Sequence, residues 1–236
     1  MTNVGYVANT QTYDTKYQTG YGLAYPDGHV IRFHRHILDY EVGLRGGNML
    51  DYGCGTGTHL YYFMQQGFTP YGCDVSETAI ERCKALMPTH ADHFHVVPST
   101  PRLRDYFDAT FDLVFSNQVL YFLNDQDMRS VIAQLYDMLK PGGIFFATMI
   151  APTNYYSRFV EGTEGGLSKC VLRGRLNEVQ CVNFKTKEQV LALFTAAGLK
   201  KLHLGYYGGV IREDEGPTDH WMFVGRKEGR EQPSRR

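Results

Sequence analysis

The chain has 236 residues, 43% of them hydrophobic, and a formal net charge of −1. This length and composition predict one well-filled domain. A charge so close to zero excludes a strong basic field over the whole molecule, so we expect no nucleic-acid partner.

The first part of the chain is a predicted N-terminal arm (residues 1–25). It lacks clear periodicity and is rich in tyrosine, whose ring face attracts cations. No basic segment followed by an apolar run opens the chain, and no run is long enough to cross a bilayer, so we expect a cytoplasmic protein without membrane contact. Five cysteines without a C-x-x-C pair fit that reducing compartment and predict no metal site.

A helix and a strand lead into the most informative motif. After Pro26-Asp27-Gly28, apolar residues recur at helical spacing from His29 onward, and Gly46-Gly47 is expected to end this helix. A strand follows at 48–52. It delivers a loop with glycine at every second position, Gly53, Gly55 and Gly57. Such a loop binds a ligand through its backbone at the start of the next helix.

The spacing of these glycines separates two classes of cofactor. The pattern G-x-G-x-G differs from the dinucleotide fingerprint G-x-G-x-x-G, in which the helix end faces a pyrophosphate. Asp51 precedes the first glycine, where its carboxylate would repel a pyrophosphate but could help to hold an ammonium group. The loop therefore favours a zwitterionic cofactor over NAD.

Strands and helices alternate further along the chain. A strand at 69–73 ends at Asp74, whose carboxylate is placed to bind ribose hydroxyls. The other predicted elements are helices beginning at Gly57, at Ser76 and at Asn124 or Asp125, and strands at 95–98, 111–115 and 144–149. This alternation predicts an α/β fold with a doubly wound, mostly parallel sheet that binds ligands at the carboxyl ends of its strands.

The last third of the chain contains a long connection. Residues 151–185 are too many for a simple link in a compact domain and are predicted to form an inserted lid. A helix from Thr186 and two closing strands at 201–207 and 221–226 complete the domain, which we place at residues 1–226. The tail 227–236 has no apolar anchors and is expected to be disordered.

Four stretches, taken in order, resemble the class I S-adenosylmethionine-dependent methyltransferases of the small-molecule type. They are the glycine segment 50–57, the acidic strand end at Asp74, the segment 111–120 and the turn 139–143. The resemblance covers roughly residues 48 to 150. It implies a Rossmann-like, seven-stranded sheet, S-adenosylmethionine as the cofactor and methyl transfer as the reaction.

The resemblance also implies which residues contact the cofactor. They are Asp51, Gly53 and Gly55 at the methionine part, Asp74 at the ribose, Val75 at the adenine face, Ser99 or Thr100 at the adenine edge, and Asn117 near the sulfonium. Tyr17 in the arm is added because a tyrosine ring attracts a sulfonium cation.

The methyl acceptor is predicted to be a small molecule. The segment Ser116-Asn117-Gln118 lacks the paired prolines that a DNA-amino methyltransferase carries after its fourth strand to stack a flipped base. The lid residues Arg158, Lys169, Arg173 and Arg175 could bind carboxylates or phosphates, which favours an anionic acceptor. Tyr121 and His220 are the candidate general bases, with His36 as a third, because they could face a substrate. The sequence does not choose between a hydroxyl and an amine, and it leaves the oligomeric state unknown.

Two other functions stay open at this point. The chain could be a non-catalytic module that binds S-adenosylmethionine or S-adenosylhomocysteine and regulates a partner. It could also be a nicotinamide oxidoreductase on the same scaffold, since a fold does not fix a function, although the glycine spacing disfavours NAD.

Overall fold

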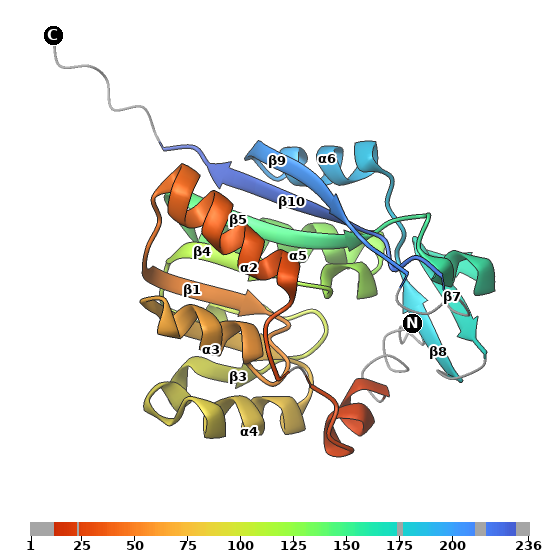
Figure 1. Ribbon diagram of the computed structural model, residues 1–236, viewed down its shortest axis with the longest axis horizontal. Coiled ribbons are helices and arrows are strands. Elements are labelled where there is room, and N and C mark those ends of the chain that lie inside the picture. The colour runs from red at the N-terminus through yellow and green to blue at the C-terminus, as the bar shows by residue number, and fades with distance from the viewer. Residues whose placement is uncertain (1–11, 23, 174–176, 211–215, 230–236) are drawn as a thin grey trace, which may run out of the picture.

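A seven-stranded sheet runs through the middle of the protein (Figure 1), seen in a computed structural model that describes residues 12–22, 24–173, 177–210 and 216–229. The strand order is β3-β2-β1-β4-β5-β10-β9. Neighbours from β3 to β5 pair in parallel, whereas β10 is antiparallel to both β5 and β9. The strands are β1 (Gly47–Tyr52), β2 (Phe68–Asp74), β3 (Phe94–Val96), β4 (Phe111–Ser116), β5 (Leu139–Ile150), β9 (Leu199–Tyr207) and β10 (His220–Lys227). The predicted doubly wound, mostly parallel sheet is confirmed.

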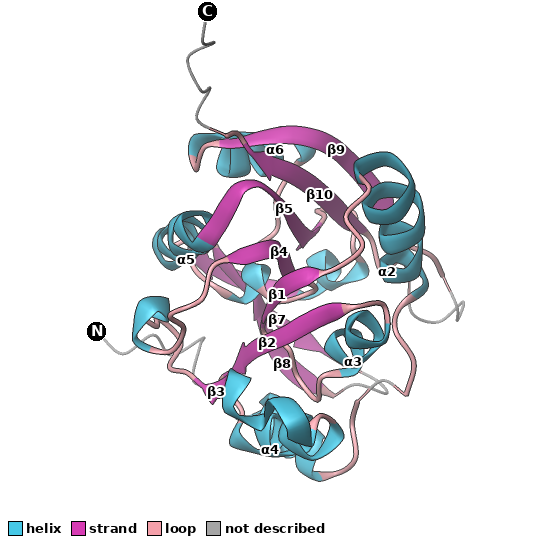
Figure 2. Ribbon diagram, turned by 90° about the vertical axis from the view of Figure 1, so that its left-hand side faces the viewer, coloured by secondary structure: helices cyan, strands magenta, loops and turns pink. Residues whose placement is uncertain are grey.

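Helices cover both faces of this sheet (Figure 2). On one face lie α5 (Asp125–Met138) and α6 (Lys187–Ala196), packed with strand residues such as Val114. On the other face lie α2 (Gly28–Arg32), its π-helical continuation η1 (Phe33–Val42), α3 (Thr58–Gln65) and α4 (Glu77–Leu86), packed with residues such as Leu113. Successive strand residues point to opposite faces, so the buried pair Leu113-Val114 contributes to both cores. Short 3₁₀ helices lie at η2 (Pro88–His93), η3 (Leu103–Asp105) and η4 (Leu120–Phe122).

Local sequence fixes the starts of three helices, as expected. The Ser76 hydroxyl accepts the Ala79 N–H at 3.1 Å, Asn124 caps α5, and Thr186 forms a capping box at the start of α6. The end of the first helix differs from the prediction. The π-helical η1 ends at Gly43, which has a left-handed φ of 71°, and not at Gly46-Gly47, where Gly47 already begins β1.

The long connection at 151–185 forms a small sheet of its own. After the 3₁₀ helix η5 (Tyr155–Phe159), the strands β6 (Val160–Glu164), β7 (Leu167–Leu172) and β8 (Glu178–Val182) pair antiparallel. Figure 1 shows this sheet beside the main one, beyond the carboxyl ends of its parallel strands. An insert is therefore present where the lid was predicted, while a closing movement stays a prediction.

The two ends of the chain are described in part. Residues 12–18 of the predicted arm are helical, and residues 1–11 lie outside the described part of the structure. Strand β10 runs one residue beyond the expected end, because Lys227 still pairs with Leu199. Residues 230–236 of the predicted tail are also outside the described part. In the four described ranges, no helix is long and apolar enough to span a membrane.

Candidate active site

The glycine loop joins β1 to α3 at the carboxyl edge of the sheet. Gly53, Gly55 and Gly57 have positive φ angles of 81°, 53° and 82°, a region that side-chain-bearing residues rarely adopt. A Cβ atom on Gly55 would also lie 2.8 Å from the hydroxyl oxygen of Tyr17. Backbone geometry and close packing therefore both require glycine in this loop.

Asp74, at the end of β2, ties its own turn to the glycine loop. Its carboxylate oxygens accept the N–H of Gly55 at 2.9 Å and the N–H of Ser76 at 3.0 Å. Burial raises the pKa of the Asp74 carboxyl, and the backbone N–H groups oppose that shift. The carboxylate has further acceptor positions with which to bind hydroxyl groups.

A cavity opens over this loop and contains most of the cofactor contacts expected from the sequence. Tyr17, Gly53, Gly55, Asp74, Val75 and Asn117 all line it. Ser99 is not among the lining residues, and Val97 lies there instead, because the chain leaves β3 at Val96. The adenine-edge assignment of Ser99 stays a prediction.

Asp51 lies behind the glycine loop and does not line the cavity. Its exposed fraction is 2%. Burial, followed by the nearby charge of Asp74, raises the pKa of Asp51 well above the ordinary range. The contact between Asp51 and the methionine part of the cofactor that the resemblance implies stays a prediction.

The two candidate bases, Tyr121 and His220, pack together beside the cavity but do not line it. Their ring centroids are 5.7 Å apart, and the His220 ring stacks on Tyr207 at 5.1 Å. Nδ1 of His220 donates to the Thr218 carbonyl at 2.9 Å, and burial lowers the pKa of His220 to about 4. Burial also raises the pKa of Tyr121 well above its usual value. The third candidate, His36, is exposed on η1.

Sequence reasoning predicted Asn117 at the site but missed two polar partners that also line the cavity, Asp27 and His59. Asp27, directly before α2, accepts a hydrogen bond from Asn117 Nδ2 at 3.1 Å, and Nε2 of His59 lies 3.4 Å from the same carboxylate oxygen. His29 Nε2 donates to Asn117 Oδ1 at 2.9 Å. In the sequence, Pro26-Asp27-Gly28 indicates only that a helix begins after it. The signal that could have found the cluster is the acidic residue at that helix start, but its partners lie 32 and 90 positions away.

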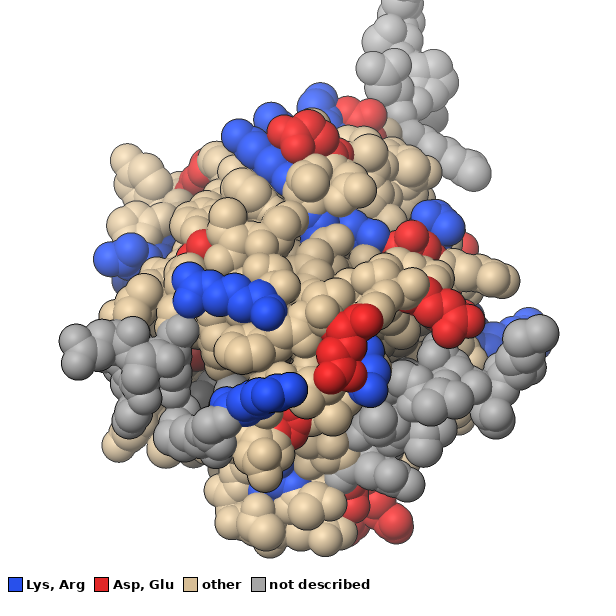
Figure 3. Space-filling model, turned by 90° about the vertical axis from the view of Figure 1, so that its right-hand side faces the viewer, with Lys and Arg blue, Asp and Glu red and all other residues tan. Residues whose placement is uncertain are grey.

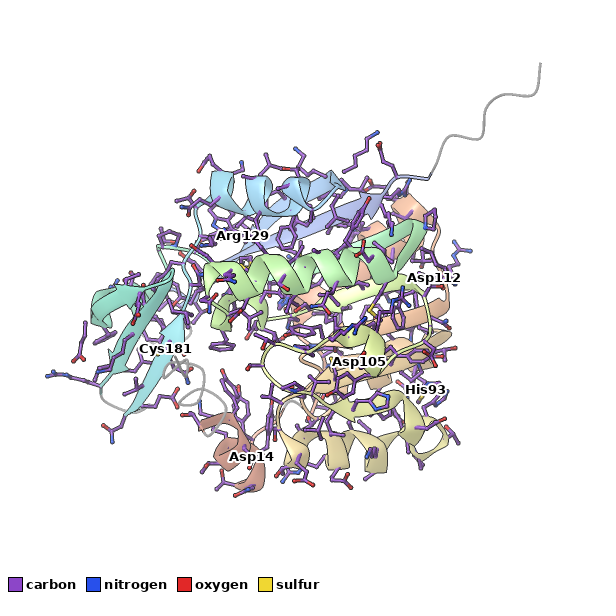
Figure 4. All side chains as sticks on the ribbon, turned by 180° about the vertical axis from the view of Figure 1, so that it is seen from behind. Asp14, His93, Asp105, Asp112, Arg129 and Cys181 are labelled. Carbon is purple, nitrogen blue, oxygen red and sulfur yellow. The ribbon has the colours of Figure 1, made fainter. Side chains whose placement is uncertain are left out.

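The N-terminal helix at residues 12–18 closes one side of the cavity with aromatic rings. Tyr13 packs edge-on against Phe122 with centroids 5.4 Å apart. The helix is held from two directions: Asp14 accepts a hydrogen bond from Ser76 Oγ at 2.5 Å, and Lys16 pairs with Glu178 of β8 at 2.7 Å. Figure 4 shows Asp14 between α4 and the inserted sheet.

The comparisons with known proteins agree that this chain is similar to methyltransferases. Residues 50–147 match the family described as "Methyltransferase domain". An uncharacterised methyltransferase of Synechocystis sp. is 30% identical over 125 residues, 52% of this chain and 57% of that protein. A ubiquinone biosynthesis O-methyltransferase of Pseudomonas entomophila is 30% identical over 129 residues, 54% of this chain and 55% of that protein. The chain thus matches little more than half the length of these curated relatives.

A solved structure extends the likeness of fold over nearly the whole chain. The N-methyltransferase NodS of Bradyrhizobium japonicum, in complex with S-adenosyl-L-homocysteine, superposes with a TM-score of 0.63 at 20% identity and covers 94% of this chain and 100% of NodS. Fold, glycine loop and family match agree with the resemblance noted in the sequence. Residues 50–147 of the chain match a methyltransferase domain, in agreement with the class I S-adenosylmethionine-dependent methyltransferases that the sequence resembles.

Proposed function

We propose that the protein transfers a methyl group from S-adenosylmethionine to an oxygen or nitrogen atom of a small molecule. The observation that supports this best is the cavity, where the glycine loop, Asp74 and Asn117 meet at the carboxyl ends of the strands. Val75 and Val97 offer apolar contact for an adenine ring, next to a carboxylate suited to ribose hydroxyls. The residues present fit this cofactor.

The protein's part in such a reaction is alignment and exclusion of water. The cofactor supplies an electrophilic methyl group on a sulfonium, so no enzyme nucleophile is needed. Gln118, which lines the cavity, has a left-handed φ of 60°. Its N–H donates to Thr148 Oγ1 at 2.7 Å and its side-chain amide donates to the Tyr207 hydroxyl at 3.3 Å. These bonds hold a conformation that costs about 1–3 kcal/mol, as is common where a chain presents side chains to a ligand.

The acceptor atom decides whether a base is needed. A hydroxyl requires a general base within hydrogen-bond reach, whereas a neutral amine needs little beyond orientation. Asp27 and His59 line the cavity and could accept a proton from the acceptor. Tyr121 and His220 do not line it, so a proton could reach them only through other groups. The relatives include both an O-methyltransferase and an N-methyltransferase, so the proposal keeps both atoms.

The charge expected for the acceptor changes once the cavity is considered. Arg158 and Arg173 of the insert are exposed, Lys169 pairs with Glu161 at 3.0 Å, and Arg175 lies outside the described part of the structure. Figure 3, which faces the side of the insert, shows basic and acidic side chains interspersed. Among the described residues that line the cavity, two are carboxylates, Asp27 and Asp74, and none is Lys or Arg. The described part of the cavity lining therefore offers no cationic partner for the anionic acceptor that the lid composition suggested, and the proposal specifies no charge for the acceptor.

Calorimetric titration with S-adenosylmethionine, S-adenosylhomocysteine and NAD tests the cofactor. Asp74→Ala should weaken binding of the first two by about 1–3 kcal/mol through lost charge-assisted hydrogen bonds. Asp92→Ala, the same change at an exposed position, should leave binding unchanged. Binding of NAD alone would contradict the proposal.

A panel of amines and hydroxyl compounds, followed by the release of S-adenosylhomocysteine, then separates an enzyme from a non-catalytic binding module. Transfer to any member supports the enzyme. Tight cofactor binding without turnover across the panel would favour the regulatory module instead.

A further inference from the structure

A carboxylate and an imidazole meet across one end of the cavity. Asp27 stands just before α2, and His59 is the second residue of α3, directly after the glycine loop. Nε2 of His59 lies 3.4 Å from Asp27 Oδ2 and 3.4 Å from the Asp27 backbone nitrogen. A neutral ring accepts from that backbone N–H, and a protonated ring donates to the carboxylate. Both side chains line the cavity.

The Asp27 carboxylate is held in place from behind. Asn117 Oδ1 accepts from His29 Nε2 at 2.9 Å and from Thr148 Oγ1 at 3.2 Å, and these donors fix the orientation of the amide. Asn117 Nδ2 must then face Asp27, to which it donates at 3.1 Å. The carboxylate is therefore positioned by a partly buried set of hydrogen-bonded side chains.

Asp27 is also the carboxyl group on this side that stays ionised. Although burial opposes the shift, hydrogen bonds and charge from His59, with Asn117 adding to them, lower the pKa of Asp27. Asp51 differs from Asp27 in both position and ionisation. It lies behind the glycine loop, and its pKa is raised. The anionic group offered to a ligand at this end comes from the segment before α2 and not from the glycine motif.

The opposite end of the cavity already has residues suited to a nucleoside. Asp74, Val75 and Val97 lie at the ends of β2 and β3, and the glycine loop separates them from Asp27 and His59. A ligand with its nucleoside at the first end and its tail along the loop would direct that tail to Asp27 and His59. The tail of the cofactor carries an ammonium, whose charge is complementary to Asp27, and a carboxylate, which can accept a hydrogen bond from an N–H of the His59 ring.

We propose that Asp27 and His59 form a clamp for the amino-acid end of the cofactor, in which Asp27 binds the ammonium and His59 binds the carboxylate. The clamp rests on the proposed function, since it needs S-adenosylmethionine or its product as the ligand. In the structure the two side chains contact each other. Binding exchanges this single contact for two, one at each charge of the zwitterion.

Three ligands separate the charges: S-adenosylhomocysteine, its decarboxylated amine, and 5′-methylthioadenosine, which carries neither charge. By calorimetry, Asp27→Asn should weaken the first two by about 10- to 100-fold, the range for a charged hydrogen-bonded contact, and leave the third within about twofold. His59→Gln should weaken only S-adenosylhomocysteine. Asp51→Asn is the matched control and should change the three affinities in parallel or not at all.

Each other result overturns the clamp. Equal weakening of all three ligands by Asp27→Asn would make Asp27 a structural residue. Unchanged affinities with a large fall in turnover would place its carboxylate at the acceptor. If the unaltered protein binds none of the three, the proposed function fails together with the clamp, whereas retained binding with the wrong ligand pattern removes the clamp alone.

Discussion

At the scale of single residues, Gly55 is a loop position where a side chain would meet both backbone strain and a close neighbour. Gly55→Ala would combine a φ of 53° with a Cβ only 2.8 Å from the Tyr17 hydroxyl. We expect a loss of about 1–3 kcal/mol in the free energy of unfolding, together with weaker cofactor binding. Urea denaturation and calorimetry measure the two effects. Gly162→Ala is the control, since its φ is not positive and no atom lies within 4 Å of an added Cβ.

The titration of His220 makes the stability of the folded protein depend on pH, in a direction that follows from its pKa. Its pKa of about 4 in the folded protein lies below the ordinary value near 6.5, so the unfolded chain binds the proton more readily. The contribution of His220 to the free energy of unfolding should be fully present above about pH 6.5 and be lost as the pH falls toward 4. From pH 7.5 to 5, His220 should account for about 2 kcal/mol of destabilisation.

The variant His220→Asn tests that pH dependence. The Asn side-chain N–H₂ can replace the donor to Thr218 while removing the titration. Urea denaturation at pH 5 and pH 7.5 should show a smaller difference for the variant than for the unaltered protein. An equal difference would mean that other groups carry the dependence, among them His29 and His34, whose pKa values are also lowered by burial.

At the scale of elements, the N-terminal helix and the inserted sheet are joined by Lys16. Its ammonium pairs with Glu178 at 2.7 Å and lies 5.0 Å from the centroid of the Tyr13 ring. Lys16→Met keeps the apolar stem and removes the charge. Chymotrypsin should then cleave after the arm tyrosines about three- to tenfold faster, matching a loss of about 1 kcal/mol in local stability. Lys169→Met, which breaks an exposed pair, should have little effect on that cleavage.

Elements with strong local signals were predictable, and those formed by distant pairing were not. Ser76, Asn124 and Thr186 cap their helices through neighbours two or three residues away, so short-range sequence was enough. In the insert, β6 is exposed at every residue and has no apolar alternation to indicate a strand. The same holds for the site: the glycine loop and Asp74 lie within a recognisable motif, whereas Asp27 acquires its role only through contacts with His59 and Asn117.

At the scale of the whole molecule, the sheet depends on its last strand. Strand β10 lies between β5 and β9, and Phe223 stacks on Phe194 of α6 with centroids 4.3 Å apart. Deleting residues 199–236 should leave β5 as an unpaired edge and expose its buried residues, so we expect loss of near-ultraviolet circular dichroism and aggregation. Deleting only residues 230–236 should preserve the spectrum and the unfolding midpoint. A folded, soluble product of the longer deletion would contradict this view.

The position of β10 between β5 and the edge strand β9 also bears on how the protein is made. Translation delivers the glycine loop and the five parallel strands of the sheet, β1 to β5, early, at about 5–20 residues per second. The partner that covers β5 appears only when residues 220–227 leave the ribosome. For several seconds the nascent chain therefore carries a complete ligand-binding motif while the β5 edge of its sheet is still open. During this period a chaperone, or early binding of the cofactor, would protect the nascent chain from pairing with another chain through that edge.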